Sequence, residues 1–127
     1  MLSNAPVYPT LPVTDLQKSR EFYEKTLGLS VAEEMPHGLV LKAGSGTQLY
    51  IYQRGPSKAD HTLAGFRVEN INETVDQLFQ KGVVFEKYDF PGIKTNEKGI
   101  AEQDSVKAAW FKDPDGNILG ITEVLRK

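Results

Sequence analysis

The sequence predicts an α+β fold in which two βαβββ modules form one domain with strongly curved, mixed sheets. Three observations predict it: an internal repeat of a strand–helix unit, short strand-like runs bounded by turn residues, and a length of 127 residues. A chain of this length forms one domain, or two small halves with a common core, and buries roughly two thirds of its unfolded surface. Within the single domain 1–127, the expected limits are 6–54 for the N-terminal module, 55–60 for a linker and 61–125 for the C-terminal module.

The first predicted helix begins after Thr14 or Asp15 and ends at Gly28. Either of the first two side chains can accept a hydrogen bond from a free N–H group of the first helical turn. Between these limits the apolar residues fall close to one face at helical spacing. Gly28 stands where a helix end favours a residue that tolerates a positive φ.

A second helix repeats the first at a constant offset of 55 residues. The paired positions are Val13 and Val68, Asp15 and Asn70, Leu16 and Ile71, Ser19 and Thr74, and Tyr23 and Leu78. The closing glycines, Gly28 and Gly82, miss this offset by one residue, which predicts a second helix that is one residue shorter. Two copies indicate a duplicated unit, since a solenoid needs about three or more repeats. A chance match between two amphipathic helices is the alternative.

Short strands are predicted around both helices, at 7–13, 30–35, 38–43 and 47–53, and at 61–68, 83–90, 105–111 and 117–124. The first carries two prolines, which cannot donate to a ladder, so it should lie at a sheet edge or carry a distortion. The turn Asp113-Pro114-Asp115-Gly116 suits a hairpin between the last two strands. Residues 91–104 lack periodicity and predict a long loop, which acts as a lid, binds a ligand or stays disordered.

Composition argues against several classes of partner. The 15 basic and 17 acidic residues give a net charge of −2, so there is no field to attract nucleic acid or an anionic membrane. Cysteine is absent, which leaves neither a disulfide framework nor a thiol nucleophile. No apolar run approaches the roughly 20 residues of a membrane span, and the first six residues lack the regions of a signal peptide. We expect a cytoplasmic protein.

The motif Val-x-Asp-Leu-x-x-Ser-x-x-Phe-Tyr-x-x-x-Leu-Gly at 13–28 and the turn Asp-Pro-Asp-Gly-Asn at 113–117 resemble the vicinal oxygen chelate superfamily. Its members include glyoxalase I, extradiol dioxygenases, fosfomycin-resistance enzymes and bleomycin-resistance proteins. The resemblance covers nearly the whole chain and implies a glyoxalase/bleomycin-resistance-type domain whose sheets curl into a cupped cavity. It also implies a homodimer that completes its cavities across a two-fold interface. It does not decide the activity, because function lies in the site and not in the scaffold.

In catalytic members of this superfamily, side chains from four strands hold a divalent metal. The resemblance places Tyr8, Tyr50, Leu63 and Gly120 at these positions. Leucine and glycine offer no side-chain donor, and tyrosine is a rare ligand because its hydroxyl has a pKa of about 10. The sequence therefore predicts a member without a metal or another cofactor. His61, two residues before Leu63, is an alternative ligand if the strand slips in register; otherwise it is an exposed histidine at a strand start.

Several aromatic side chains are expected on the inner faces of the sheets. The candidate ligand-binding cavity comprises Tyr8, Tyr50, Tyr52, Leu63, Phe66, Trp110 and Gly120. Two interpretations stay open: the aromatic side chains fill a core, or they stack on a flat organic ligand. Arg67 and Lys107 alternate to the other strand face from Phe66 and Trp110 if the strands are regular, and they have no assigned role.

Three functions remain open. The first is a metal-free protein of the bleomycin-resistance kind, which binds a small aromatic or partly apolar molecule and could confer antibiotic resistance. The second is a metal-dependent lyase, isomerase or dioxygenase of the glyoxalase kind, which the four ligand positions disfavour. The third is a non-catalytic accessory domain. No catalytic residue is assigned, because Asp15 and Asn70 are interpreted as helix caps and Asp113 and Asp115 as turn residues.

Overall fold

The computed structural model describes residues 2–125 and divides the chain into two compact units, Met1–Ser57 and Lys58–Lys127. This division falls inside the predicted linker. Unit 1 contains β1 (Thr10–Val13), α1 (Leu16–Glu21), the π-helical turn η1 (Phe22–Thr26), β2 (Ser30–Met35), β3 (Gly38–Lys42), the 3-10 turn η2 (Gly44–Gly46) and β4 (Gln48–Gln53). Unit 2 contains β5 (Thr62–Arg67), α2 (Ile71–Gln80), β6 (Asp89–Phe90), β7 (Ile93–Lys94), β8 (Ala101–Gln103), β9 (Val106–Lys112) and β10 (Ile118–Val124).

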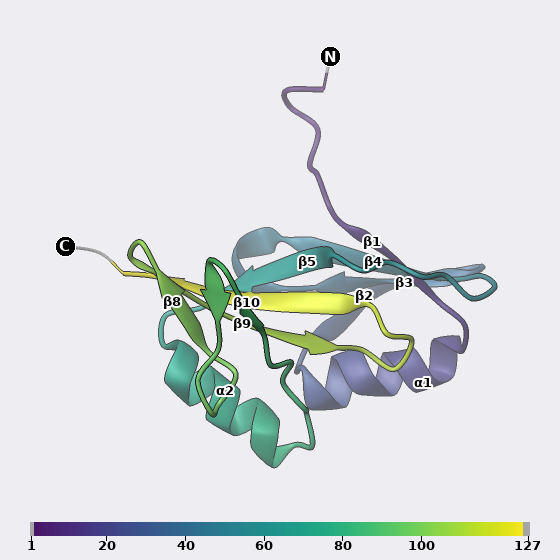
Figure 1. The fold of residues 1–127 in the computed structure, drawn as a ribbon. Helices are drawn as coiled ribbons and strands as arrows, with labels where there is room; N and C mark the ends of the chain where they lie inside the picture. Colours follow the sequence, from purple (N-terminus) through teal and green to yellow (C-terminus); the bar gives the residue numbers. More distant parts are fainter. Residues whose placement is uncertain (1, 126–127) are drawn as a thin grey trace. The chain divides into compact units, whose positions relative to one another are not determined.

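Each unit is built around one four-stranded mixed sheet (Figure 1). The strand order is β1-β4-β3-β2 in unit 1 and β5-β10-β9-β8 in unit 2. In both sheets the first pair is parallel and the other pairs are antiparallel. The shared order and pairing confirm the α+β fold with two βαβββ modules, and they place the proline-bearing β1 at an edge of its sheet, as predicted.

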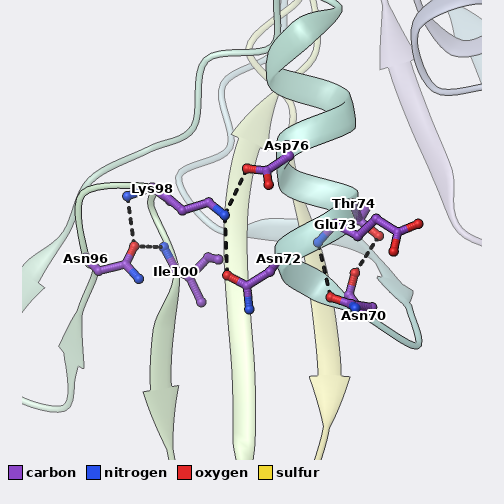
Figure 2. A network of polar contacts seen from close by, with 8 residues as sticks. All are labelled: Asn70, Asn72, Glu73, Thr74, Asp76, Asn96, Lys98 and Ile100. Carbon is purple, nitrogen blue, oxygen red and sulfur yellow. Dashed lines mark hydrogen bonds and ion pairs between the residues drawn. The ribbon is translucent and has the colours of Figure 1, made fainter.

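Both predicted helix caps are present. The Asp15 Oδ1 atom accepts a hydrogen bond of 3.1 Å from the backbone N–H of Lys18. The Asn70 Oδ1 atom accepts an equivalent bond of 3.1 Å from the N–H of Glu73 (Figure 2). Each side chain satisfies one N–H group that the first helical turn leaves without a partner. Within residues 2–125, neither helix is long and apolar enough to cross a membrane.

The one-residue mismatch between the two helices has a structural cause in η1. The N–H of Val83 bonds the carbonyl of Leu78 at 3.0 Å, which closes α2 in the usual Schellman arrangement beside Gly82 at φ 94°. In unit 1 the corresponding bond joins the N–H of Leu29 to the carbonyl of Tyr23 at 2.9 Å, and it spans one residue more. A π-helical turn takes up the extra residue, because its hydrogen bonds join residues five apart.

One face of each sheet carries most of the buried strand side chains of its unit. In unit 2, Leu119 and Ile121 of β10 are 0% and 2% exposed and lie on the face that α2 covers. Directly opposite Leu119 are Ala64 on β5 and Phe111 on β9, which share that face because paired residues point the same way. The buried strand residues of unit 1 are Leu11, Val13, Leu39, Leu41, Leu49 and Ile51.

The strand predicted at 83–90 is largely wrong. Only Phe85 makes an isolated bridge, to Phe111 of β9, and only Asp89 and Phe90 form a strand, in a hairpin with β7. The fourth strand of the sheet is β8, which lies inside the segment predicted as a loop and pairs with Val106–Ala108. Along the edge of β9, Phe85 therefore pairs at one end and β8 at the other. The sequence did not predict β8 because this strand is too short and polar to show strand periodicity.

Candidate functional site

The site is built on the face of the second sheet that α2 does not cover, termed here the open face. Gly120 of β10 lies directly opposite Gly65 of β5 and Trp110 of β9. Since successive residues of a strand point to opposite faces, these three lie on the face away from Leu119 and Ile121. The register therefore brings two glycines and the indole of Trp110 into one row across the sheet.

The indole ring packs beside the backbone of Gly120, which is buried. A Cβ atom built at Gly120 would lie 3.5 Å from Cδ1 and 3.6 Å from Nε1 of Trp110, and 3.4 Å from Cγ2 of Thr62. The pyrrole edge of the indole thus lies next to this position. At Gly65, which is exposed, a Cβ atom would meet only the carbonyl oxygen of Gly120 within 4 Å, at 3.9 Å. The exposed surface of this row is therefore Gly65 and the uncovered part of Trp110.

Two further aromatic side chains extend this surface. The ring of Tyr88 meets Trp110 edge to face at a centroid distance of 5.3 Å, and it stacks on Phe90 at 5.7 Å. Burial, and secondarily the charge of Glu86, raises the pKa of the Tyr88 hydroxyl above its ordinary value. Sequence reasoning missed Tyr88 and Phe90, although their spacing of two residues is the signal that places both on one side of an extended segment.

The hairpin that carries these rings is fastened at its base. The Thr95 hydroxyl accepts a bond of 2.9 Å from the N–H of Tyr88 and donates one of 3.2 Å to the Tyr88 carbonyl. Beyond it, the Lys98 ammonium binds Asp76 at 2.8 Å and Asn72 at 3.4 Å on α2 (Figure 2). The part of the predicted 91–104 loop around Lys98 is therefore attached to the helix.

In unit 1 the corresponding face carries tyrosines. Tyr50 and Tyr52 stack with centroids 6.0 Å apart and planes 13° apart. The Tyr50 ring also covers Gly38, where a Cβ atom would lie 2.7 Å from the tyrosine Oη and 2.8 Å from Cε1. These two partly buried side chains pack on each other, and Tyr50 also packs on the backbone of β3.

The other predicted site residues are described within their own units. Tyr8 precedes β1 and is 49% exposed. Phe66 lies opposite Ile121, so it points to the helix-covered face and not toward Trp110. Leu63 is the unpaired residue of a bulge, since Thr62 pairs with Ile118 and Ala64 pairs with Leu119. Of the C-terminal candidates, the structure brings together only Trp110 and Gly120.

The four superfamily ligand positions do not fit a divalent metal. Gly120 and Leu63 have no donor atom, and Tyr50 is packed over Gly38. His61 lies before β5, its side chain is 70% exposed, and its Nδ1 atom lies 3.7 Å from Oδ1 of Asp60. Within residues 2–125, no three His, Asp or Glu side chains are grouped so that they could hold a metal ion.

Asp113 has the structural role that its turn predicted. It is 5% exposed, and its Oδ1 atom accepts bonds of 2.9 Å from the N–H groups of Asp115 and Asn117. Its Oδ2 atom accepts a further bond of 2.8 Å from the Asn117 side chain. Because these bonds all serve the β9–β10 turn, Asp113 closes the hairpin that holds Trp110 opposite Gly120.

Comparisons with known proteins extend the picture. Residues 6–121 match the family model of the Glyoxalase/Bleomycin resistance protein/Dioxygenase superfamily. The uncharacterized protein YraH of Bacillus subtilis (strain 168) is 28% identical over 131 residues, which cover 91% of this chain and 94% of YraH. A glyoxalase family protein from Enterococcus faecalis has a similar structure, with a TM-score of 0.72, 24% identity and coverage of 97% of this chain and 100% of that one. TnmS3, an antibiotic binding protein from Streptomyces sp. CB03234, also has a similar structure, with a TM-score of 0.70 and 21% sequence identity. The match covers 98% of this chain and 98% of TnmS3.

Proposed function

This chain belongs to the Glyoxalase/Bleomycin resistance protein/Dioxygenase superfamily, and we propose that it is a metal-free binding protein for a small, planar, partly apolar molecule. The ligand ring covers the exposed Gly65 on the open face and lies against the partly buried indole of Trp110. Tyr88 packs edge to face against the indole, and Phe90 stacks on Tyr88.

The observation that carries this proposal is the placement of Trp110 beside Gly120. A glycine in the middle of a strand weakens the strand and often marks a point of close approach by a ligand or another backbone. Here the glycine borders an aromatic ring that is only partly buried, and aromatic surface with a few polar groups is typical of small-molecule sites. The fold of TnmS3, an antibiotic binding protein, makes aromatic antibiotics the first ligands to test.

The donor set argues against the metal-dependent alternative. Lyases, isomerases and dioxygenases of the glyoxalase kind use side chains at four positions that are Tyr8, Tyr50, Leu63 and Gly120 in this chain. Two of these have no donor atom, and imidazole or carboxylate is absent from all four. A binding role needs none of these ligands.

A melting-temperature screen tests the binding proposal. Aromatic antibiotics and aromatic metabolites are added to the protein, and a ligand at a hundredfold excess over its dissociation constant should stabilise the fold by about 2.7 kcal/mol. Trp110→Ala should abolish the shift. Phe79→Ala is the matched control, because Phe79 is an aromatic residue of α2 that is 70% exposed and lies outside the open face. A shift that survives in Trp110→Ala, or a broad screen without a shift, would contradict the proposal.

We further propose that the protein is a cytoplasmic homodimer. The first and last strands of each sheet leave backbone groups unpaired within their unit, and such edges pair readily with another chain unless they are covered. Light scattering at tens of micromolar protein should give twice the monomer mass, and a monomeric mass would contradict the proposal.

A further inference from the structure

The open face carries three hydrogen-bond donors without partners around Gly120. They are the indole N–H of Trp110, the hydroxyl of Thr122 and the guanidinium of Arg67. Within residues 2–125, none of these side chains makes a hydrogen bond or an ion pair. The Trp110 nitrogen is also open to solvent, because the described residues include no buried side-chain nitrogen or oxygen without a partner.

The strand register places these donors together. Arg67 follows Gly65 by two residues on β5, and Thr122 follows Gly120 by two residues on β10. Arg67 and Thr122 lie directly opposite each other, so they form the row next to the row of Gly65, Gly120 and Trp110. All five residues point to the open face. Arg67 is a diagonal neighbour of Gly120, a separation that a long side chain can bridge.

Among the described residues, no carboxylate forms an ion pair with Arg67. Glu123 lies on the other face, where its Oε1 atom accepts a bond of 2.8 Å from the N–H of Ile71. Glu86 lies 3.7 Å from the ammonium of Lys112, which is in the row on the other side of Gly120. A guanidinium is a planar donor that fits the two oxygens of a carboxylate, so its natural partner is an oxyanion from outside the chain.

We infer that the ligand is an aromatic organic acid, whose ring covers Gly65 beside Trp110 and whose carboxylate is bound by Arg67 and Thr122. This inference rests on the proposed function and adds the charge of the ligand to it. Arg67 is a cation without an ion-pair partner among the described residues, which favours an acidic group over a basic one. Arg67 is then the residue that selects acids over their neutral counterparts.

Isothermal titration calorimetry with matched probes tests the inference. The probes are benzoate, 2-naphthoate and anthracene-2-carboxylate at pH 7, each compared with its neutral carboxamide. At least one carboxylate should bind about tenfold more tightly than its amide, which corresponds to about 1.4 kcal/mol. Arg67→Gln should remove this difference, because it should weaken binding of the carboxylate more than binding of the amide. Arg67→Lys, which keeps the charge but loses the planar fork, should keep only part of the difference.

Lys107→Gln is the control for loss of one positive charge. Lys107 pairs in register with Glu123 and therefore points to the helix-covered face, so this variant should bind both probes as the unaltered protein does. If no carboxylate binds more tightly than its amide, or if Arg67→Gln leaves the preference intact, the inference is wrong. Equal binding of acid and amide would contradict this inference but not the proposed function. If neither probe binds and the melting screen gives no shift, both the inference and the proposed function are wrong.

Discussion

Tyr50 occupies in the first sheet the position that Gly120 occupies in the second. Each lies on the strand that pairs in parallel with the first strand of its unit, opposite Thr10 in one case and Gly65 in the other. The duplicated scaffold thus carries a bulky phenol on one open face and no side chain on the equivalent place of the other. The proposed binding of a ligand beside Trp110 depends on this difference.

A large side chain at position 120 should remove ligand binding without removing the fold. In Gly120→Ala, the new methyl group meets Thr62 and Trp110 at ordinary contact distances of 3.4 to 3.6 Å, so the melting temperature should change little. Gly120→Leu should push the indole aside and abolish the ligand-induced melting shift. Circular dichroism checks that both variants keep the fold, and a leucine variant that still binds would contradict the proposed position of the ligand.

The buried turn carboxylate should be important for stability. Asp113→Ala leaves three donors without their acceptor, two of them backbone N–H groups, and should lower the free energy of unfolding by about 2–3 kcal/mol. Urea denaturation measures the change. Asp89→Ala, which removes an exposed carboxylate from the hairpin, should stay within about 0.5 kcal/mol of the original protein. Equal effects of the two substitutions would show that the turn network contributes little.

Three glycines should differ in a graded way when each is replaced by alanine. Gly44 has no positive φ and nothing within 4 Å of a Cβ atom, so its replacement should be nearly neutral. Gly82 has φ +94° in open space and should cost about 1 kcal/mol. Gly99 has φ +90° and would also place its Cβ 2.8 Å from the Cβ of Phe85, so its replacement should cost the most. Urea midpoints give the order, and a different order would contradict the local geometry.

The Tyr88 hydroxyl should make stability fall at alkaline pH. Its pKa is raised in the folded chain, first by burial and then by Glu86, so the fold favours the protonated form. That contribution is fully present below the unfolded pKa of about 10 and is lost as the pH rises through the higher folded value. Ultraviolet titration should show a late-ionising tyrosine that Tyr88→Phe removes and Glu86→Gln shifts to lower pH. A titration unchanged in Tyr88→Phe would contradict this assignment.

Local sequence signals predicted the fold well wherever short-range geometry decides it. Asp15, Asn70, Gly28 and Gly82 limit the helices because caps and positive-φ ends depend on residues within one turn. The proline-bearing β1 lies at a sheet edge for an equally local reason, since proline lacks the N–H group that a ladder requires.

The candidate site was harder to predict, because it depends on pairing between distant residues. The bulge at Leu63 and the division of the β9 edge between Phe85 and β8 are long-range events without a local signal. They decide that Phe66 faces the helix and that Tyr88 reaches Trp110. Alternation did hold from Ala64 to Arg67 in β5 and along β9, and it sends Arg67 away from Phe66 and Lys107 away from Trp110.

The fluorescence of Trp110 reports on the proposed binding site alone, because Trp110 is the only tryptophan among the 127 residues. A ligand identified by its melting shift is titrated into the unaltered protein and into Gly120→Leu while the fluorescence of the indole is recorded. We expect a saturable change in intensity or wavelength with the unaltered protein and none with Gly120→Leu. A ligand that stabilises the protein with no change in Trp110 emission would show that it binds away from the open face of the second sheet.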